Sequence, residues 1–221
     1  MHTFDTAAPI SAVLDVPAGR VRFVAADRTD TTVEVLHADP GKSRDAATAQ
    51  QTAVSYADGV LRVTTPAPDN RLVGRRGSLE ITVHLPAGSH VRATTAAAEL
   101  HSAGRLGDIA FDGAYRKITI DEAASVRLTA VDGDVEIGRL DGPAQITTAR
   151  GDITIAEAVQ GTVVLRTETG NITVTAAAGV SAVLDAGTGH GRIGNALKND
   201  GAAGLDIRAT TARGDITARS L

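Results

Sequence analysis

The stretch TTARGDITI runs from Thr147 to Ile155, and TTARGDITA runs from Thr210 to Ala218 near the end of the chain. After each glycine, apolar and polar residues alternate, as they do in a β-strand with one buried face. Aligning the chain on such glycines gives five segments: VDGDVEI at Gly133, ARGDITI at Gly151, ETGNITV at Gly170, GTGHGRI at Gly189 and ARGDITA at Gly214. Their spacings of 18, 19, 19 and 25 residues predict a structural repeat.

Apolar residues recur at fixed positions in each repeat. Two positions after the glycine stand Val135, Ile153, Ile172, Gly191 and Ile216, and five positions before it stand Leu128, Ile146, Leu165, Leu184 and Ala209. These positions are an odd number of residues apart, so both face inward only if the chain bends between them. Glycine followed by a small polar residue supplies that bend. The repeat predicts an all-β fold over residues 96–221, a parallel β-helix or β-solenoid of 18–19-residue coils, each stacked on the previous one.

Residues 1–95 have a different pattern, with alternating strands separated by Pro, Gly and Asp turns. In LEITVHL, from Leu79 to Leu85, alternate residues are apolar and share one face. We expect this region to form a β-rich, sandwich-like cap over the open end of the coils. One segment, Ser43–Ala53, has local helical character, although a loop is an equal alternative.

Composition narrows the classes of function. The 221 residues include 22 basic and 26 acidic side chains and carry a net charge of −4, which disfavours nucleic acid and other polyanionic partners unless a local basic patch exists. There are no cysteines, so disulfides and thiolate metal sites are excluded. The N-terminal sequence has neither a basic region nor a continuous apolar run, and no run is long enough to span a membrane, so a cytoplasmic location is expected.

Several separate segments also resemble the DUF4097 family of β-strand-repeat proteins, which is common in actinobacteria. They are DRTDTTVEVLHADP, VSYADGVLRVTTP, RRGSLEITVHLPAGS, the recurring GDITI-type strands and VLDAGTGHGRIGNAL. The resemblance as a whole covers nearly the whole chain, from Phe4 to Leu221. The resemblance implies a β-helical or β-solenoid fold, a relation to adhesin head domains and no established catalytic residues to carry over.

The repeated Arg-Gly-Asp tripeptide, at Arg150–Asp152 and Arg213–Asp215, is the first candidate for a recognition motif. The other repeats replace its arginine and tolerate Asn171 or His190 at the aspartate position, so the pattern favours a structural corner. The aligned acids form a second candidate, a carboxylate ladder that could bind calcium: Asp108, Asp134, Asp152 and Asp215, interrupted by Asn171 and His190. Solvated corner residues are the favoured interpretation, because calcium β-rolls use a shorter repeat with paired glycines.

Other chemistry has weaker support. Asp132 and Asp134, with Asp141 nearby, could form the carboxylate pair of a glycosidase, but the chain has no Trp and only two Tyr to hold a sugar. The six histidines lack helical metal-ligand spacing, although His84 and His90 could approach each other across a turn. DPGKSRD ends like a phosphate-binding loop but lacks its first glycine. We predict no catalytic, cofactor-binding or metal-binding residues.

The sequence therefore predicts a non-enzymatic structural or protein-interaction module, a scaffold or adhesin-like protein. Its expected partner is another protein or a second copy of the chain, since the ends of a solenoid present unpaired strand edges. The alternative is a carbohydrate-binding or carbohydrate-active β-helix protein.

Overall fold

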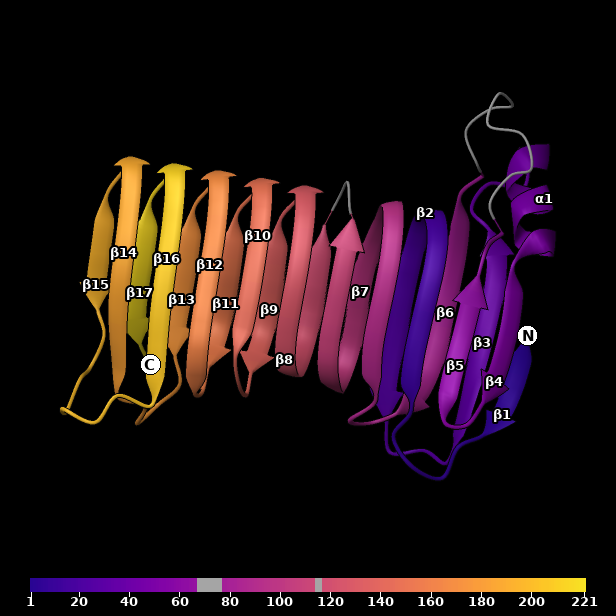
Figure 1. The fold of residues 1–221 in the computed structure, drawn as a ribbon, viewed down its shortest axis with the longest axis horizontal. Coiled ribbons are helices and arrows are strands. Elements are labelled where there is room, and N and C mark those ends of the chain that lie inside the picture. The colour runs from indigo at the N-terminus through magenta and orange to yellow at the C-terminus, as the bar shows by residue number, and fades with distance from the viewer. Residues whose placement is uncertain (67–76, 114–116) are drawn as a thin grey trace.

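The protein is nearly all β-structure, with 70% of the described residues in strands and 4% in helix. The computed structural model describes residues 1–66, 77–113 and 117–221. The described strands join into one 17-stranded sheet (Figure 1). The predicted all-β class is confirmed.

Most strands belong to two stacks, within each of which neighbouring strands pair in parallel. The chain alternates between the two stacks. In spatial order, stack A contains β5 (Val60–Thr64), the first part of β2 (Ser11–Ala26), the first and last parts of β7 (His90–Gly113), the second part of β8 (Ile118–Asp132), β10 (Ala144–Arg150), β12 (Gly161–Thr169), β16 (Leu205–Arg213) and β14 (Ala182–His190). Stack B contains β6 (Leu79–Pro86), the second part of β2, the middle of β7, the first part of β8, β9 (Val135–Leu140), β11 (Ile153–Ala158), β13 (Ile172–Ala176), β17 (Ile216–Ser220) and β15 (Ile193–Ala196).

The two stacks share one hydrophobic core, because alternate residues of each strand point inward. In β11, Ile153 and Ile155 are fully buried, whereas Thr154 between them is only partly buried. Parallel register places Ile153 beside Val135 on one side and Ile172 on the other. Like residues therefore form continuous aliphatic columns, which explains how a core forms with 2% aromatic residues.

Glycine is required where the chain turns from stack A to stack B. Gly151 has a φ of 129°, a conformation that residues with a Cβ rarely adopt. A Cβ there would also clash with the carbonyl oxygen of Gly133, which stacks against it. The hydroxyl of Thr167 donates to the carbonyl oxygen of Gly151 at 3.2 Å, so this oxygen at the corner has a hydrogen-bond partner.

The N-terminal end is covered by antiparallel strands and a helix, at the right of Figure 1. β3 (Asp30–His37) pairs with β6 and with β1 (His2–Asp5), while β4 (Ala53–Ala57) pairs with β5. The predicted helical segment is confirmed as α1 (Ser43–Gln51). Its buried Asp45 accepts the Ser78 N–H at 3.0 Å, so the helix is tied to the chain just before β6.

The expectation that each coil stacks on the previous one is wrong at the C-terminal end. β12 pairs with β16, and β16 pairs with β14, so the last coil of the chain, β16–β17, lies between the two coils that precede it. Its Leu205, Ile207 and Ile216 are fully buried, whereas the β14–β15 coil contains four glycines between Gly187 and Gly194. Placing the glycine-rich coil outermost leaves less apolar surface exposed.

The alignment on Gly189 is also wrong, by two residues. His190 lies beside Arg213 and Ile193 lies beside Ile216, so Gly191 is the partner of Gly214. A shift of two residues keeps every side chain on the same face, so alternation alone did not reveal it.

Parallel pairing begins earlier in the chain than the predicted cap allows. β2 pairs in parallel with β5, β6 and β7, although all of β2 lies within residues 1–95. β7 runs through residue 95 without a break. The division of the chain at residue 95 stays a prediction.

Candidate functional site

The aspartates at the corner between the stacks form a ladder of side-chain to backbone hydrogen bonds. Asp134 accepts the N–H of Asp152 at 2.9 Å, and Asp152 accepts the N–H of Asn171 at 2.7 Å. Asn171 in turn accepts from Asp215, and Asp215 accepts from Arg192, both at 2.8 Å. Each side chain therefore accepts a hydrogen bond from a backbone N–H of the adjacent coil, which is a structural role.

Two members of the predicted carboxylate ladder lie elsewhere. His190 is beside Arg213, and Arg192 takes its place at the corner. Asp108 is beside Ser125 at the opposite corner, at the start of the stack A strands. Within the described residues, no three His, Asp or Glu side chains gather where they could hold a metal ion.

The first Arg-Gly-Asp tripeptide has its charges engaged within the protein. Arg150 forms an ion pair with Asp132 at 3.0 Å, and Asp152 belongs to the corner ladder. In the second copy, Asp215 also contacts Arg192, at 3.8 Å. These contacts support the structural interpretation of the tripeptide, because both aspartates serve the corner.

The predicted glycosidase acids do not form a facing pair. Asp132 binds Arg150, Asp134 caps the next coil, and Asp141 binds Arg139 at 2.9 Å. Arg139 also forms an ion pair with Glu157, and these two carboxylates raise the pKa of Arg139 above its ordinary value.

The remaining candidates from the sequence either lie apart in the structure or are engaged in local contacts. His84 lies on β6 in stack B and His90 on β7 in stack A, so the structure does not bring them together. In DPGKSRD, the Asp39 carboxylate accepts the N–H of Gly41 and pairs with Lys42. The hydrogen bond from Lys42 lowers the pKa of Asp39. The polar groups of this turn therefore bind one another.

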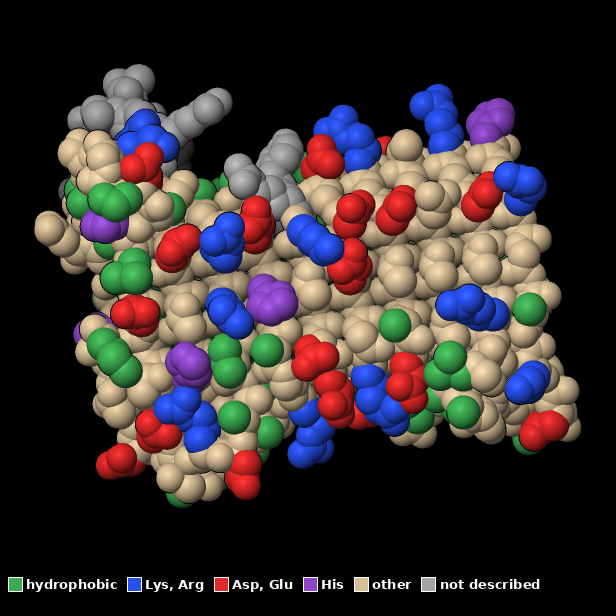
Figure 2. All heavy atoms as spheres, turned by 180° about the vertical axis from the view of Figure 1, so that it is seen from behind, with side chains coloured by type: hydrophobic (Ala, Val, Ile, Leu, Met, Phe, Trp, Pro, Cys, Tyr) green, Lys and Arg blue, Asp and Glu red, His purple; other side chains and the backbone are tan. Residues whose placement is uncertain are grey.

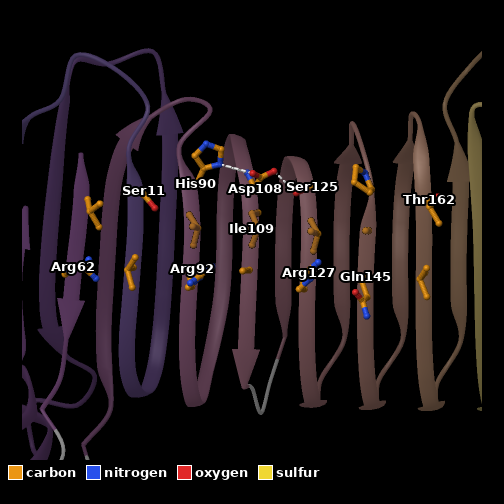
Figure 3. A pocket seen from close by; sticks show the side chains of 18 residues that line it. Ser11, Arg62, His90, Arg92, Asp108, Ile109, Ser125, Arg127, Gln145 and Thr162 are labelled. Atoms are coloured by element: carbon orange, nitrogen blue, oxygen red, sulfur yellow. Dashed lines mark hydrogen bonds and ion pairs between the residues drawn. The ribbon is translucent and has the colours of Figure 1, made fainter. Parts of the chain in front are cut away.

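An open groove with a volume of about 830 Å³ crosses stack A (Figure 3). One row of its residues contains Ser11, His90, Asp108, Ser125 and Thr162, and a parallel row contains Arg62, Arg92, Arg127 and Gln145. Sequence analysis missed this groove because its residues come from six strands between positions 11 and 164. The signal lay only in the register of those strands.

Asp108 contacts both His90 and Ser125, but this order does not suit nucleophilic catalysis. The Ser125 hydroxyl donates to Asp108 at 2.6 Å, so its proton points to a carboxylate and not to the imidazole. The Nδ1 of His90 accepts the N–H of Asp108 at 3.0 Å and lies 3.3 Å from its carboxylate. The two contacts at Nδ1 are alternatives, since only a protonated Nδ1 can pair with the carboxylate.

The C-terminal end has a free edge. β14 pairs only with β16, and β15 pairs only with β17, among the strands that the structure describes. Val183 and Ile193 on these strands are 37% and 46% exposed. This end lies at the left of Figure 1, opposite the helix-covered end.

No helix in the described ranges is long and apolar enough to cross a membrane. No family model matches the chain, and no curated protein matches it.

A solved structure matches the chain in fold. A protein from Bacteroides fragilis described as a "putative adhesin" is 15% identical, with 98% of this chain and 95% of that chain covered and a TM-score of 0.57. A "putative cell adhesion protein" from Clostridium sporogenes is 10% identical, with 100% and 98% covered and a TM-score of 0.43. At these identities the likeness concerns the fold alone.

Proposed function

We propose that the protein is a non-enzymatic interaction module of the DUF4097 family, built as a β-solenoid that associates with a second copy of itself through its C-terminal end. Register supports the solenoid, because each coil contributes one strand to each stack and the columns are continuous. The adhesin description of the Bacteroides fragilis structure, which has this fold, is consistent with a binding role.

A non-enzymatic role is supported by how the candidate groups are engaged. The carboxylates predicted for hydrolysis are bound to arginines or to backbone N–H groups. The groove lining offers one carboxylate, Asp108, whereas glycoside hydrolysis needs two.

The observation that carries the proposal is the difference between the two ends. At the N-terminal end, antiparallel β1, β3 and β4 extend the two stacks, and the outer edges of β1 and β4 are unpaired among the described strands. The core is nevertheless covered at this end, because Phe4 of β1 and Tyr56 of β4 contact each other and pack against it. At the C-terminal end of the molecule, the β14–β15 coil has unpaired edges on both strands, among those that the structure describes, and exposes Val183 and Ile193. An unpaired edge with apolar side chains is a template for another strand.

The covering of the core at the N-terminal end also decides the geometry of association. A head-to-tail filament would join the exposed apolar end of one copy to the opposite end of the next, where Phe4 and Tyr56 already cover the core. Two copies that instead join their exposed C-terminal ends meet tail to tail around a twofold axis, which is a closed arrangement. The product is a dimer.

Light scattering across a concentration series tests the proposal. We expect a dimeric mass at high protein concentration, and Ile193→Lys should shift the mass to the monomer because a charge enters the apolar contact. Leu36→Lys is the matched control, since Leu36 is 46% exposed but lies on β3 at the other end. A monomeric mass at every concentration, or equal loss in both variants, would refute tail-to-tail association.

A further inference from the structure

We propose that the groove across stack A binds an extended acidic peptide that lies along the rod axis, with its carboxylates on Arg62, Arg92 and Arg127. This site is separate from the C-terminal edge and independent of self-association.

The three arginines form a line because of strand register. Val13 lies beside both Arg62 and Arg92, and Ala110 lies beside Arg127 (Figure 3). One strand therefore separates each arginine from the next. With strands about 4.8 Å apart, successive guanidinium groups start from positions roughly 10 Å apart.

These guanidinium groups are not neutralised within the protein. Among the described residues, none of the three arginines forms an ion pair or a side-chain hydrogen bond. Three arginines and one aspartate give the groove lining a net charge of +2, although the chain as a whole carries −4. The one aspartate, Asp108, already accepts from Ser125.

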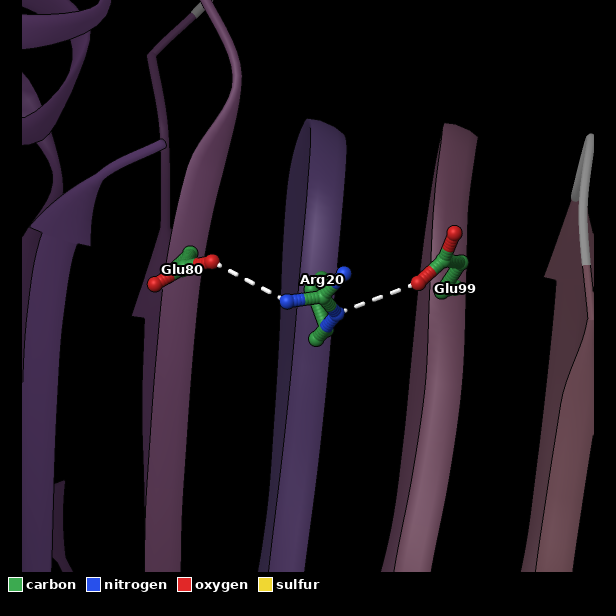
Figure 4. Close-up of polar contacts among 3 residues, drawn as sticks. All are labelled: Arg20, Glu80 and Glu99. Atoms are coloured by element: carbon green, nitrogen blue, oxygen red, sulfur yellow. Dashed lines mark hydrogen bonds and ion pairs between the residues drawn. The ribbon is translucent and has the colours of Figure 1, made fainter. Parts of the chain in front are cut away.

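Stack B contains an outward-facing arginine whose charge is neutralised by residues on the adjacent strands. Arg20 is flanked by Glu80 at 3.1 Å and Glu99 at 3.0 Å on the two adjacent strands (Figure 4). On that face, seen in Figure 2, acidic and basic side chains lie side by side. The corresponding neighbours in the groove are Val13, Ala110 and Gln145, so the groove arginines keep their charge for a ligand.

The row of available arginines ends before the C-terminal coils. Arg208 continues the same line on β16, next to Val164, but it pairs with Asp206 at 2.8 Å. That hydrogen bond raises the pKa of Arg208 above its ordinary value. Along this line, the arginines without a partner among the described residues are thus the three on β5, β7 and β8.

The spacing and the lining favour a peptide over other polyanions. A polyproline II peptide advances about 3.1 Å per residue, so acidic residues three positions apart recur every ~9.3 Å on one side. Arginine binds carboxylates with paired N–H donors. The groove lining contains no Phe, Tyr or Trp, whereas single-stranded nucleic acids are bound by stacking on such side chains.

Fluorescence anisotropy with a labelled peptide of four Glu-Pro-Pro repeats tests the site. We expect saturable binding that weakens with salt, and about tenfold weaker binding for Arg92→Gln and for Arg127→Gln, each of which removes a charge-assisted contact. Arg92→Lys should retain part of the affinity because it keeps the charge. Arg20→Gln is the matched control on stack B and should leave binding unchanged.

Other outcomes would overturn the inference. These are the absence of saturable binding, equal binding of an isomer peptide with its glutamates contiguous, or equal weakening by Arg20→Gln. Saturable binding of polygalacturonate in place of the peptide would also reject the peptide and assign the groove to an acidic polysaccharide. Since the groove is remote from the C-terminal edge, the Arg92→Gln variant should keep the mass of the unmodified protein.

Discussion

Asp152 shows what each corner residue contributes. Its side chain accepts the N–H of Asn171, while its own N–H donates to Asp134. Asn171 performs the same task in the next coil, so an oxygen acceptor is needed and a negative charge is not. This explains why the repeated tripeptide tolerates Asn at its third position.

Two substitutions of Asp152 distinguish its role as a hydrogen-bond acceptor from any role of its negative charge. Asp152→Ala should lower the free energy of unfolding by about 1 kcal/mol, because the N–H of Asn171 loses its acceptor. Asp152→Asn keeps an acceptor and should cost less than half of that. Urea denaturation measures both, and equal losses in the two variants would show that the charge is what matters.

At the scale of strands, the periodic pattern of the sequence predicts which residues face the core and where the chain turns. Alternation in segments such as ITI identified the inward residues of β11, and the glycine spacing identified the corners. Register errors of two residues were invisible, because they preserve the buried face. Asp108 was misplaced for a related reason, since Gly-Asp pairs occur at both corners.

The column of Ile153 tests this description of the strands. Ile153→Asp should lower the free energy of unfolding by more than about 4 kcal/mol, because an unpaired charge enters a dry column between Val135 and Ile172. Thr154→Asp, at the adjacent outward position, should change it by less than about 1 kcal/mol. Thermal melting distinguishes the two, and an unchanged melting curve for Ile153→Asp would contradict the aliphatic columns.

At the scale of the whole molecule, sequence could not give the order of the coils. A coil pairs equally well by pattern with any other coil, so the position of β16–β17 is decided by total burial, which no single segment encodes. The groove was hidden for the same reason, since its arginines are aligned only after the coils are ordered. The free edge of β14 and β15 is a consequence of this order.

The order of the coils can be measured directly, because the chain has no cysteine to interfere. Thr162 lies beside Asp206, and Asp206 lies beside Val183. The Cα atoms of the first pair are about 4.8 Å apart, within reach of a disulfide, whereas Thr162 and Val183 are roughly 10 Å apart, beyond its limit of about 7 Å. Under oxidation, Thr162→Cys with Asp206→Cys should cross-link within one chain, and Thr162→Cys with Val183→Cys should not. The reverse result would mean that the coils stack in sequence order and that the free edge belongs to the last coil.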